Sequence, residues 1–113
     1  MRRIYKLLDA PSWEAAQAAG MFTGSAVDER DGFIHFSDAG QAQETARLHF
    51  KGQSDLVLLT VDADQLGEAL KWEPSRGGAL FPHLYAPLPV AAVIDARGLQ
   101  LDADGAPWLG PLS

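Results

Sequence analysis

Apolar residues along the chain fall into short runs separated by polar and turn-forming segments. The run at residues 4–8 mixes β-branched, aromatic and aliphatic residues and ends at the turn-prone Asp9, which is typical of a strand. The run at residues 56–61 is the most continuous one, and such a run predicts a strand that is buried on both faces. We therefore expect the first run to form a strand and the second to form the central strand of a sheet.

Two stretches have helical features. A proline at position 11, several alanines and a glycine at position 20 predict a helix over residues 11–19, anchored to the core by Trp13. Asp38 is followed three residues later by Gln41, which is a capping-box pattern, and apolar positions 42, 46 and 50 recur at helical spacing. A second helix is therefore expected to run from this cap to about Phe50.

The rest of the chain is interrupted by glycine, proline and charged residues. Residues 21–31 lose all periodicity and are expected to form a surface loop. Residues 79–89 contain three prolines, which predicts that they cannot form a regular central strand. We expect a helical turn in residues 64–70 and short strands at 32–36, 71–73, 90–95 and 99–101, the last following a turn at Arg97-Gly98 and pairing as a hairpin.

Length and composition predict one globular domain over residues 1–113. The chain is 47% hydrophobic and 21% charged, as in an ordinary folded domain, and its length suits a single hydrophobic core. Residues 103–113 are expected to form an extended C-terminal tail, packed onto the domain by Trp108.

Charge and cysteine content argue against several classes of partner. The formal net charge is −6 and the nine basic residues are scattered, so no broad nucleic-acid surface is expected. A small anionic ligand held by one or two local cations stays open. No apolar run approaches the ~20 residues that cross a bilayer, and cysteine is absent, so we expect no membrane association and a cytoplasmic location. The oligomeric state is left open.

Candidate chemistry lies in two segments, 32–37 and 81–85, that place histidines among aromatic and apolar residues. Imidazole suits proton transfer near neutral pH and is costly to bury without a partner. We expect the two segments to form two walls of one pocket that takes a small-molecule ligand. Alternation along a strand places His35 and Ser37 on the same face. The alternative is that His35 bonds a backbone carbonyl and Ser37 caps the following helix.

Three further residues complete the candidate site. His83 follows a proline, which would present its ring rigidly, and Tyr85 lies two residues further on. Glu73 stands between a tryptophan and a proline, where an aromatic face would raise the pKa of its carboxyl into the range of a general base. The alternatives are that His83 anchors a loop, that Tyr85 packs on the core and that Glu73 is solvent exposed.

Other kinds of site lack their sequence patterns. No HxxxH, HExxH or HxH spacing occurs, so no metal site is expected. No glycine-rich phosphate loop is present either. A triad of Ser37, His35 and Glu73 can be written, but the GxSxG motif that would support hydrolase chemistry is missing.

The order of these motifs resembles a known family, the uncharacterised bacterial and plant group numbered 952 among the domains of unknown function. The resemblance extends from Ile4 to about Asp95, and it rests on Ile4-Tyr5-Lys6, Trp13, Gly32-Phe33-Ile34-His35, Ser37, Gln41, Trp72-Glu73 and Phe81-Pro82-His83-Leu84-Tyr85. That family looks like a distant, compact relative of the ADP-ribosyltransferase fold. The resemblance implies an α+β domain in which small mixed or antiparallel sheets form a split β-core with two main helices and a cleft.

The resemblance also implies roles for individual residues. ADP-ribosyltransferases grip a nicotinamide dinucleotide with a basic residue on the first strand, a second motif and a late glutamate, so NAD is the implied cofactor. By similarity Lys6 takes the first position, His35 and Ser37 the second and Glu73 the third. Lys6 departs from the arginine or histidine common there, since an ammonium lacks the planar fork of a guanidinium.

Together these observations predict a transferase-like enzyme that binds a nucleotide or another phosphorylated small molecule. The expected catalytic residues are Glu73, His35 and His83, and the expected ligand-binding residues are Lys6, Ser37 and Tyr85. The alternative is a non-catalytic module that binds a small molecule in the same pocket.

Overall fold

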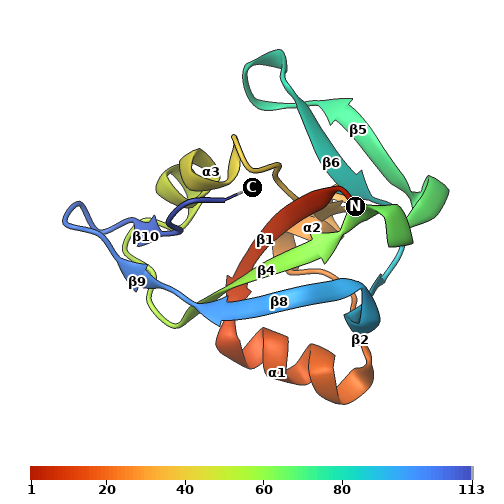
Figure 1. Cartoon of the computed structure of the whole chain (residues 1–113), viewed down its shortest axis with the longest axis horizontal. Helices are drawn as coiled ribbons and strands as arrows, with labels where there is room; N and C mark the ends of the chain where they lie inside the picture. Colours follow the sequence, from red (N-terminus) through yellow and green to blue (C-terminus); the bar gives the residue numbers. More distant parts are fainter. Residues whose placement is uncertain (113) are drawn as a thin grey trace.

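The computed structural model describes residues 1–112, in which short antiparallel sheets and three helices form an α+β domain (Figure 1). The α+β prediction with antiparallel sheets is confirmed. The helices are α1 (Ala10–Ala19), α2 (Ala26–Asp31) and α3 (Ala42–His49). The strands are β1 (Arg3–Asp9), β2 (Met21–Phe22), β3 (Ile34–His35), β4 (Leu56–Asp62), β5 (Leu70–Pro74), β6 (Leu80–Leu84), β7 (Leu88–Pro89), β8 (Val93–Gly98), β9 (Gln100–Leu101) and β10 (Pro107–Trp108).

The largest sheet has the order β1-β4-β8, with β4 in the centre as its apolar run predicts. The β1 and β4 strands pair along their whole length, from Arg3 opposite Asp62 to Asp9 opposite Leu56. All residues of β4 except Thr60 are buried, because both faces of the strand are covered. Val57, Leu59 and Val61 pack in the main apolar cluster, and Leu58 packs in a second apolar cluster. The predicted strands at 4–8 and 56–61 are confirmed.

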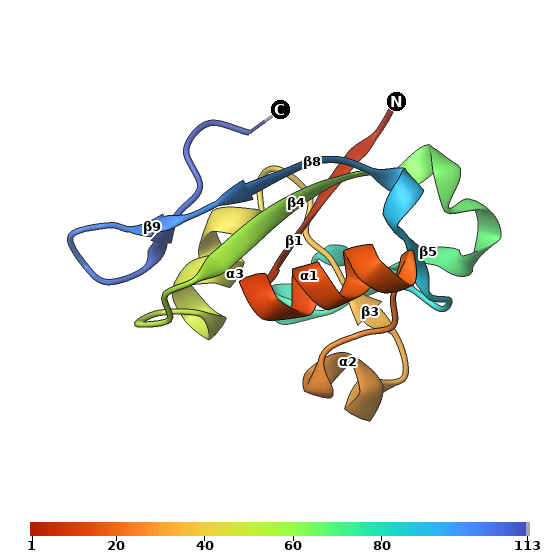
Figure 2. The same ribbon diagram turned by 90° about the horizontal axis from the view of Figure 1, so that it is seen from below.

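The first helix begins directly after β1, and its two ends follow from single residues. Asp9 accepts a hydrogen bond from Ser12 N at 3.0 Å, which satisfies a free N–H of the first turn. Gly20 ends the helix with φ at +82°, a left-handed conformation that suits glycine. Figure 2 shows α1 lying across one face of the β1-β4-β8 sheet, where Trp13 packs against the core. The predicted first helix is confirmed.

A second sheet has the order β3-β6-β5, and its central strand contradicts the prediction for residues 79–89. Pro82 lies inside β6 and is opposite Trp72 of β5. On the other side β3 is only two residues long, and past its end Phe36 N donates to Pro82 O at 3.0 Å. The prediction was wrong because proline lacks only the N–H, and here the neighbouring ladder ends where that N–H would be needed.

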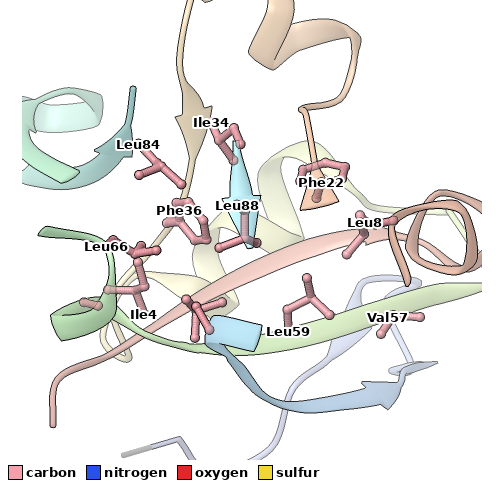
Figure 3. Close-up of a cluster of buried hydrophobic side chains, with 14 residues drawn as sticks. Ile4, Leu8, Phe22, Ile34, Phe36, Val57, Leu59, Leu66, Leu84 and Leu88 are labelled. Atoms are coloured by element: carbon pink, nitrogen blue, oxygen red, sulfur yellow. The ribbon is translucent and has the colours of Figure 1, made fainter. Parts of the chain in front are cut away.

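The two sheets meet at an isolated bridge and share one core. Tyr5 N donates to Ser37 O at 2.8 Å and Ser37 N donates to Tyr5 O at 2.9 Å, which joins the edge of β1 to the residues after β3. Ile4, Phe36 and Leu84 are almost fully buried between the sheets, as Figure 3 shows. This arrangement places the segments that carry His35 and His83 beside β1.

The segment 21–31 is not the predicted loop. It contains β2, which pairs with β7, and the six-residue helix α2, whose cap residue is Ser25. Asp28 Oδ2 accepts from Ser25 N at 2.9 Å, which is one half of a capping box. So short a helix carries no readable apolar period, which is why the pattern of residues 21–31 did not indicate it.

The second predicted helix and the 64–70 turn differ in detail from their predictions. Helix α3 starts at Ala42 rather than at the Asp38 cap, and Gln41 Oε1 accepts from Asp38 N at 3.0 Å within the turn that precedes it. Ala42 and Ala46 are fully buried, as the apolar spacing predicts. Two short 3-10 turns, Ala63–Gln65 and Gly67–Ala69, stand where one helical turn was expected.

The C-terminal third needs two corrections. The expected turn at Arg97-Gly98 is the end of β8, and β9 pairs instead with β10. Trp108 does not pack the tail, because it is 58% exposed, whereas Leu109 is fully buried. Leu109 packs with Tyr5, Leu7 and Leu58 in the second apolar cluster.

Candidate functional site

A cavity of about 630 Å³ opens between β1, α2, the β3 segment, α3 and the tip of the β5–β6 hairpin. Such a volume lies in the range of small-molecule sites, roughly 300–1,000 Å³. Four of the six predicted site residues line it: Lys6, His35, Ser37 and His83. Glu73 and Tyr85 do not line it, and they reach it only through His83.

The two histidines lie side by side on neighbouring strands of one sheet. His35 of β3 and His83 of β6 are directly opposite each other in the sheet, and their ring centroids are 5.7 Å apart with the rings nearly perpendicular. Phe33 stacks on His83 at 4.0 Å and lies 4.5 Å from the His35 ring. Cross-strand neighbours on one face of a sheet come this close as a matter of geometry.

Glu73 holds the ring of His83. Its Oε1 lies 2.8 Å from His83 Nδ1 and accepts a hydrogen bond from Tyr85 OH at 2.6 Å. The bonds from Tyr85 and His83 lower the pKa of the Glu73 carboxyl, because both stabilise its ionised form. The predicted rise in the pKa of Glu73 was therefore wrong.

This contact determines which nitrogen of His83 is free. An ionised Glu73 can only accept, so Nδ1 of His83 carries the proton and the neutral ring has its lone pair on Nε2. No residue of the described chain bonds this Nε2. Because His83 is buried at 5% exposure and lines the cavity, its Nε2 is the basic atom that the site offers to a ligand.

Asp28 of α2 joins three parts of the site. Its side chain is buried and accepts from Ser25 N, from His35 N at 3.1 Å and from His35 Nδ1 at 2.7 Å, and it lies 3.2 Å from Lys6 Nζ. Burial alone would raise the pKa of the Asp28 carboxyl, but the His35 bond and the Lys6 charge outweigh it and hold this pKa far below its usual range.

Lys6 is occupied by protein partners. Besides Asp28, its Nζ donates to His35 O at 2.9 Å. Burial lowers the pKa of the Lys6 ammonium and the Asp28 charge works in the opposite direction. Lys6 therefore links β1 to α2 and to the backbone of β3. A ligand that bound Lys6, as predicted, would have to compete with Asp28 and His35 O for its ammonium group.

The two histidines have different surroundings. His35 Nε2 lies 3.0 Å from Asp31 Oδ2, so both of its ring nitrogens face carboxylate oxygens. His35 is therefore enclosed by two acids, whereas only Nδ1 of His83 faces a carboxylate and its Nε2 has none beside it in residues 1–112.

The far end of the cavity contains two residues that sequence reasoning missed. Ser37 Oγ lies 2.9 Å from Thr45 Oγ1, and Arg76 Nη1 donates to the same Thr45 oxygen at 3.2 Å. The Ser37 side chain thus meets α3 through Thr45. No local pattern marks Thr45 or Arg76, because their proximity depends on how α3 packs beside the hairpin.

Asp28 and Phe33 were also missed, and for Asp28 a signal was present. Ser25 and Asp28 are three residues apart, which is the spacing of a capping box. Phe33 lies in the predicted 32–37 segment, but its role as a stacking surface depends on the pairing of β3 with β6.

In residues 1–112 no group of three or more histidine, aspartate or glutamate side chains is placed to hold a metal ion. None of the helices described is long and apolar enough to cross a membrane.

Fold and site together define a small antiparallel α+β domain with a cavity whose lining includes two histidines, each bonded to an acid. The chain belongs to the family described as "Protein of unknown function (DUF952)", which it matches over residues 7–96. The suspected family is thereby confirmed. No match to a curated protein is found.

Solved structures of one bacterial relative are closely similar to this chain. A crystal structure of protein CC0527 from Caulobacter crescentus is 61% identical, with a TM-score of 0.94 over 96% of this chain and 95% of that one. A double mutant of the same protein is 59% identical, with a TM-score of 0.93 and the same coverage. Its solution NMR structure is 61% identical, with a TM-score of 0.87 over 97% of this chain and 95% of that one.

Proposed function

We propose that this chain is a transferase-like enzyme that binds a nucleotide or another phosphorylated small molecule in the cavity and uses His83 as its proton acceptor. One observation carries the proposal: Nδ1 of His83 is held by Glu73, while Nε2 has no partner in the described chain. A base that is oriented by a carboxylate and lines a cavity is a recurring arrangement in group transfer.

The surroundings of His83 suit this role. When Nε2 takes a proton from a ligand hydroxyl, the ring becomes positive, and the neighbouring Glu73 carboxylate stabilises that charge. Phe33, stacked at 4.0 Å, restricts rotation of the ring. The hydroxyl oxygen would then form a bond to the group being transferred while the bond between that group and its leaving group breaks. The leaving group would depart with the bonding electron pair, and the proton would stay on Nε2 of His83. Glu73 is a positioning residue in this scheme, because it acts through His83.

The ligand class comes from the motif resemblance, which makes a nicotinamide dinucleotide the first compound to test. The order of motifs supports this choice: Lys6 lies on β1, His35 on β3 and Glu73 on β5. We extend the proposal to an ADP-ribosyltransferase-like fold and, because cysteine is absent, to a cytoplasmic location. Tyr85, which is exposed and bonded to Glu73, would support Glu73 rather than stack on the ligand.

A second function, a non-catalytic module that binds the same kind of ligand, is favoured by a specific observation. Asp28 bonds Lys6 and His35, and Glu73 is not among the residues that line the cavity. The charged groups expected to act on a ligand are thus largely satisfied by each other. A pocket of this kind would recognise a ligand without changing it.

One experiment separates the two functions. The full chain is incubated with NAD⁺ and with a panel of nucleoside phosphates, and thermal unfolding and product formation by mass spectrometry are both measured. An enzyme would be stabilised by its ligand and would form product, with His83→Gln abolishing product and Glu73→Gln slowing it and changing its pH profile. Stabilisation without product from any compound would establish the binding module, and the absence of both would overturn both functions.

A further inference from the structure

We infer that Arg76, together with the hydroxyl pair of Thr45 and Ser37, forms a subsite for the phosphate group of the ligand. The inference rests on the proposed function, since it assigns one part of the same cavity. It assigns the phosphate contact to Arg76 rather than to the predicted ligand-binding residue Lys6, whose ammonium already bonds Asp28 and a backbone carbonyl.

The three residues come from separate parts of the chain and are held in place by neighbouring contacts. Thr45 lies on α3, Arg76 lies at the tip of the β5–β6 hairpin and Ser37 follows β3. Gln41 Nε2 donates to Leu80 O at 2.8 Å, which ties the hairpin to the start of α3. In Figure 1 the hairpin and α3 lie on the same side of the β1-β4-β8 sheet.

The charges that line the cavity leave Arg76 without a counter-charge. Lys6 pairs with Asp28, and Arg30 pairs with Asp31 at 3.0 Å. The remaining acid of the lining, Asp9, caps α1. No carboxylate of residues 1–112 lies within ion-pair distance of the Arg76 guanidinium, which instead stacks over Phe81 at 4.9 Å.

Glu44 of α3 does not line the cavity, but its carboxylate interacts electrostatically with Arg76. Its pKa is lowered mainly by its hydrogen bond to Arg47 and to a smaller extent by the charge of Arg76. Because the Glu44 carboxylate bonds Arg47, it does not neutralise Arg76. An arginine stays protonated at any physiological pH, so a lasting positive charge faces the cavity.

The hydroxyl pair supplies a second donor beside this charge. Ser37 and Thr45 share one hydrogen bond, which uses one of their two hydroxyl hydrogens whichever residue donates. Thr45 also accepts from Arg76, and both backbone groups of Ser37 are already bonded to Tyr5. One hydroxyl hydrogen is therefore left for a ligand, next to the remaining N–H groups of Arg76.

This set of donors fits phosphate. A guanidinium binds two phosphate oxygens through its planar fork, and a tetrahedral group has a further oxygen for the hydroxyl hydrogen. Phe81 beneath Arg76 and His83 are two residues apart on one face of β6, which is about 7 Å at the rise of a strand. This spacing is about the width of one sugar ring. A ligand whose phosphate is bound at Arg76 could therefore present a sugar hydroxyl to Nε2 of His83.

The test uses pyrophosphate as the probe and proton–nitrogen NMR of the full chain, so that each spectrum also reports whether the variant is folded. We expect pyrophosphate to shift the signals of Thr45 and of the Arg76 side chain. Arg76→Gln should weaken binding about tenfold, the effect of losing a charged hydrogen bond, and Arg76→Lys should weaken it less. Arg30→Gln is the matched control, because this second cavity-lining arginine already pairs with an acid, and it should change affinity by less than about twofold.

Three results would overturn the subsite: no binding of pyrophosphate, shifts confined to residues outside the cavity, or equal affinity in folded Arg76→Gln. Failure of the proposed function gives a different pattern. If pyrophosphate binds through Arg76 but no compound yields product, the subsite stands and the enzyme proposal does not. If product forms equally well with Arg76→Gln, the enzyme proposal stands and the subsite does not.

Discussion

Glu73 and His83 face each other diagonally across β5 and β6, with Glu73 Oε1 2.8 Å from His83 Nδ1. In the ladder Glu73 is opposite Phe81, and Lys71 is opposite His83, so the pair spans two rows of one sheet face. The contact depends on strand register. A slip of one residue would send one of the two side chains to the other face and would remove the pair.

Replacing Glu73 with glutamine should allow the neutral ring of His83 to carry its proton on either nitrogen. In the native protein the carboxylate accepts from Nδ1, so we expect proton–nitrogen NMR of the imidazole to show the neutral ring protonated on Nδ1. An amide can accept or donate, so Glu73→Gln should give a mixture of tautomers or the reverse one. Tyr85→Phe is the matched control, since it keeps the carboxylate and the tautomer. An unchanged tautomer in Glu73→Gln would mean that this hydrogen bond does not orient the ring.

Asp28→Asn should be strongly destabilising. The substitution leaves Lys6 buried without a counter-charge, and breaking a buried pair typically costs about 3–5 kcal/mol. It also replaces one of the two acceptor oxygens with an NH2 group, so the side chain can no longer accept from both Ser25 N and His35 Nδ1 through separate oxygens. Asp31→Asn, which changes the more exposed carboxylate beside the same ring, should destabilise the domain much less, because solvent screens exposed ion pairs. Urea unfolding of the two variants measures the difference, and equal effects would contradict the central role given to Asp28.

The same carboxyl predicts how stability depends on pH. Because the pKa of Asp28 is lower in the folded chain than in the unfolded one, the unfolded chain binds more protons as the medium is acidified. The contribution of Asp28 is complete well above the unfolded pKa of about 3.9 and is lost progressively as the pH falls from about 5 toward the folded value. Urea titrations from about pH 7 to about pH 3 should show the gap between native protein and Asp28→Asn closing with acid. If the difference in unfolding free energy stayed constant with pH, the ionisation of Asp28 would not contribute to the stability of the fold.

The elements that could be predicted from the sequence are those determined by neighbouring residues. The strands β1 and β4 carry apolar runs, and α1 has its cap at Asp9 and its stop at Gly20. Helix α2 is different, because much of its stabilisation comes from Asp28 bonding to partners on β1 and β3. Lys6 is 22 residues away from Asp28, so no local window of the sequence contains that pair.

In the candidate site, too, some features follow from neighbouring residues in the sequence and others depend on tertiary contacts. That His35 and His83 share one pocket was expected from the aromatic and apolar residues around each of them. Their pairing on neighbouring strands was not expected, because residues 79–89 were predicted not to form a regular strand. Their acids could be assigned only from the fold. The 73–83 contact needs the register of β5 with β6, and the 45–76 contact needs α3 to pack beside the hairpin. Both depend on tertiary geometry that alternation and spacing do not encode.

Leu109→Ala should destabilise the domain far more than Trp108→Ala, although tryptophan is the larger side chain. Leu109 is fully buried and packs against Tyr5 and Leu7, two residues of β1 that also line the cavity. Emptying such a position costs about 2–5 kcal/mol, whereas Trp108 is 58% exposed and its removal should cost about 0.5 kcal/mol. Urea unfolding of both variants decides the point. A larger loss in Trp108→Ala would show that the tail is held by the aromatic ring, as its composition first suggested. A larger loss of stability in Leu109→Ala would instead show that residues 106–109 support the cavity wall, through the packing of Leu109 against β1.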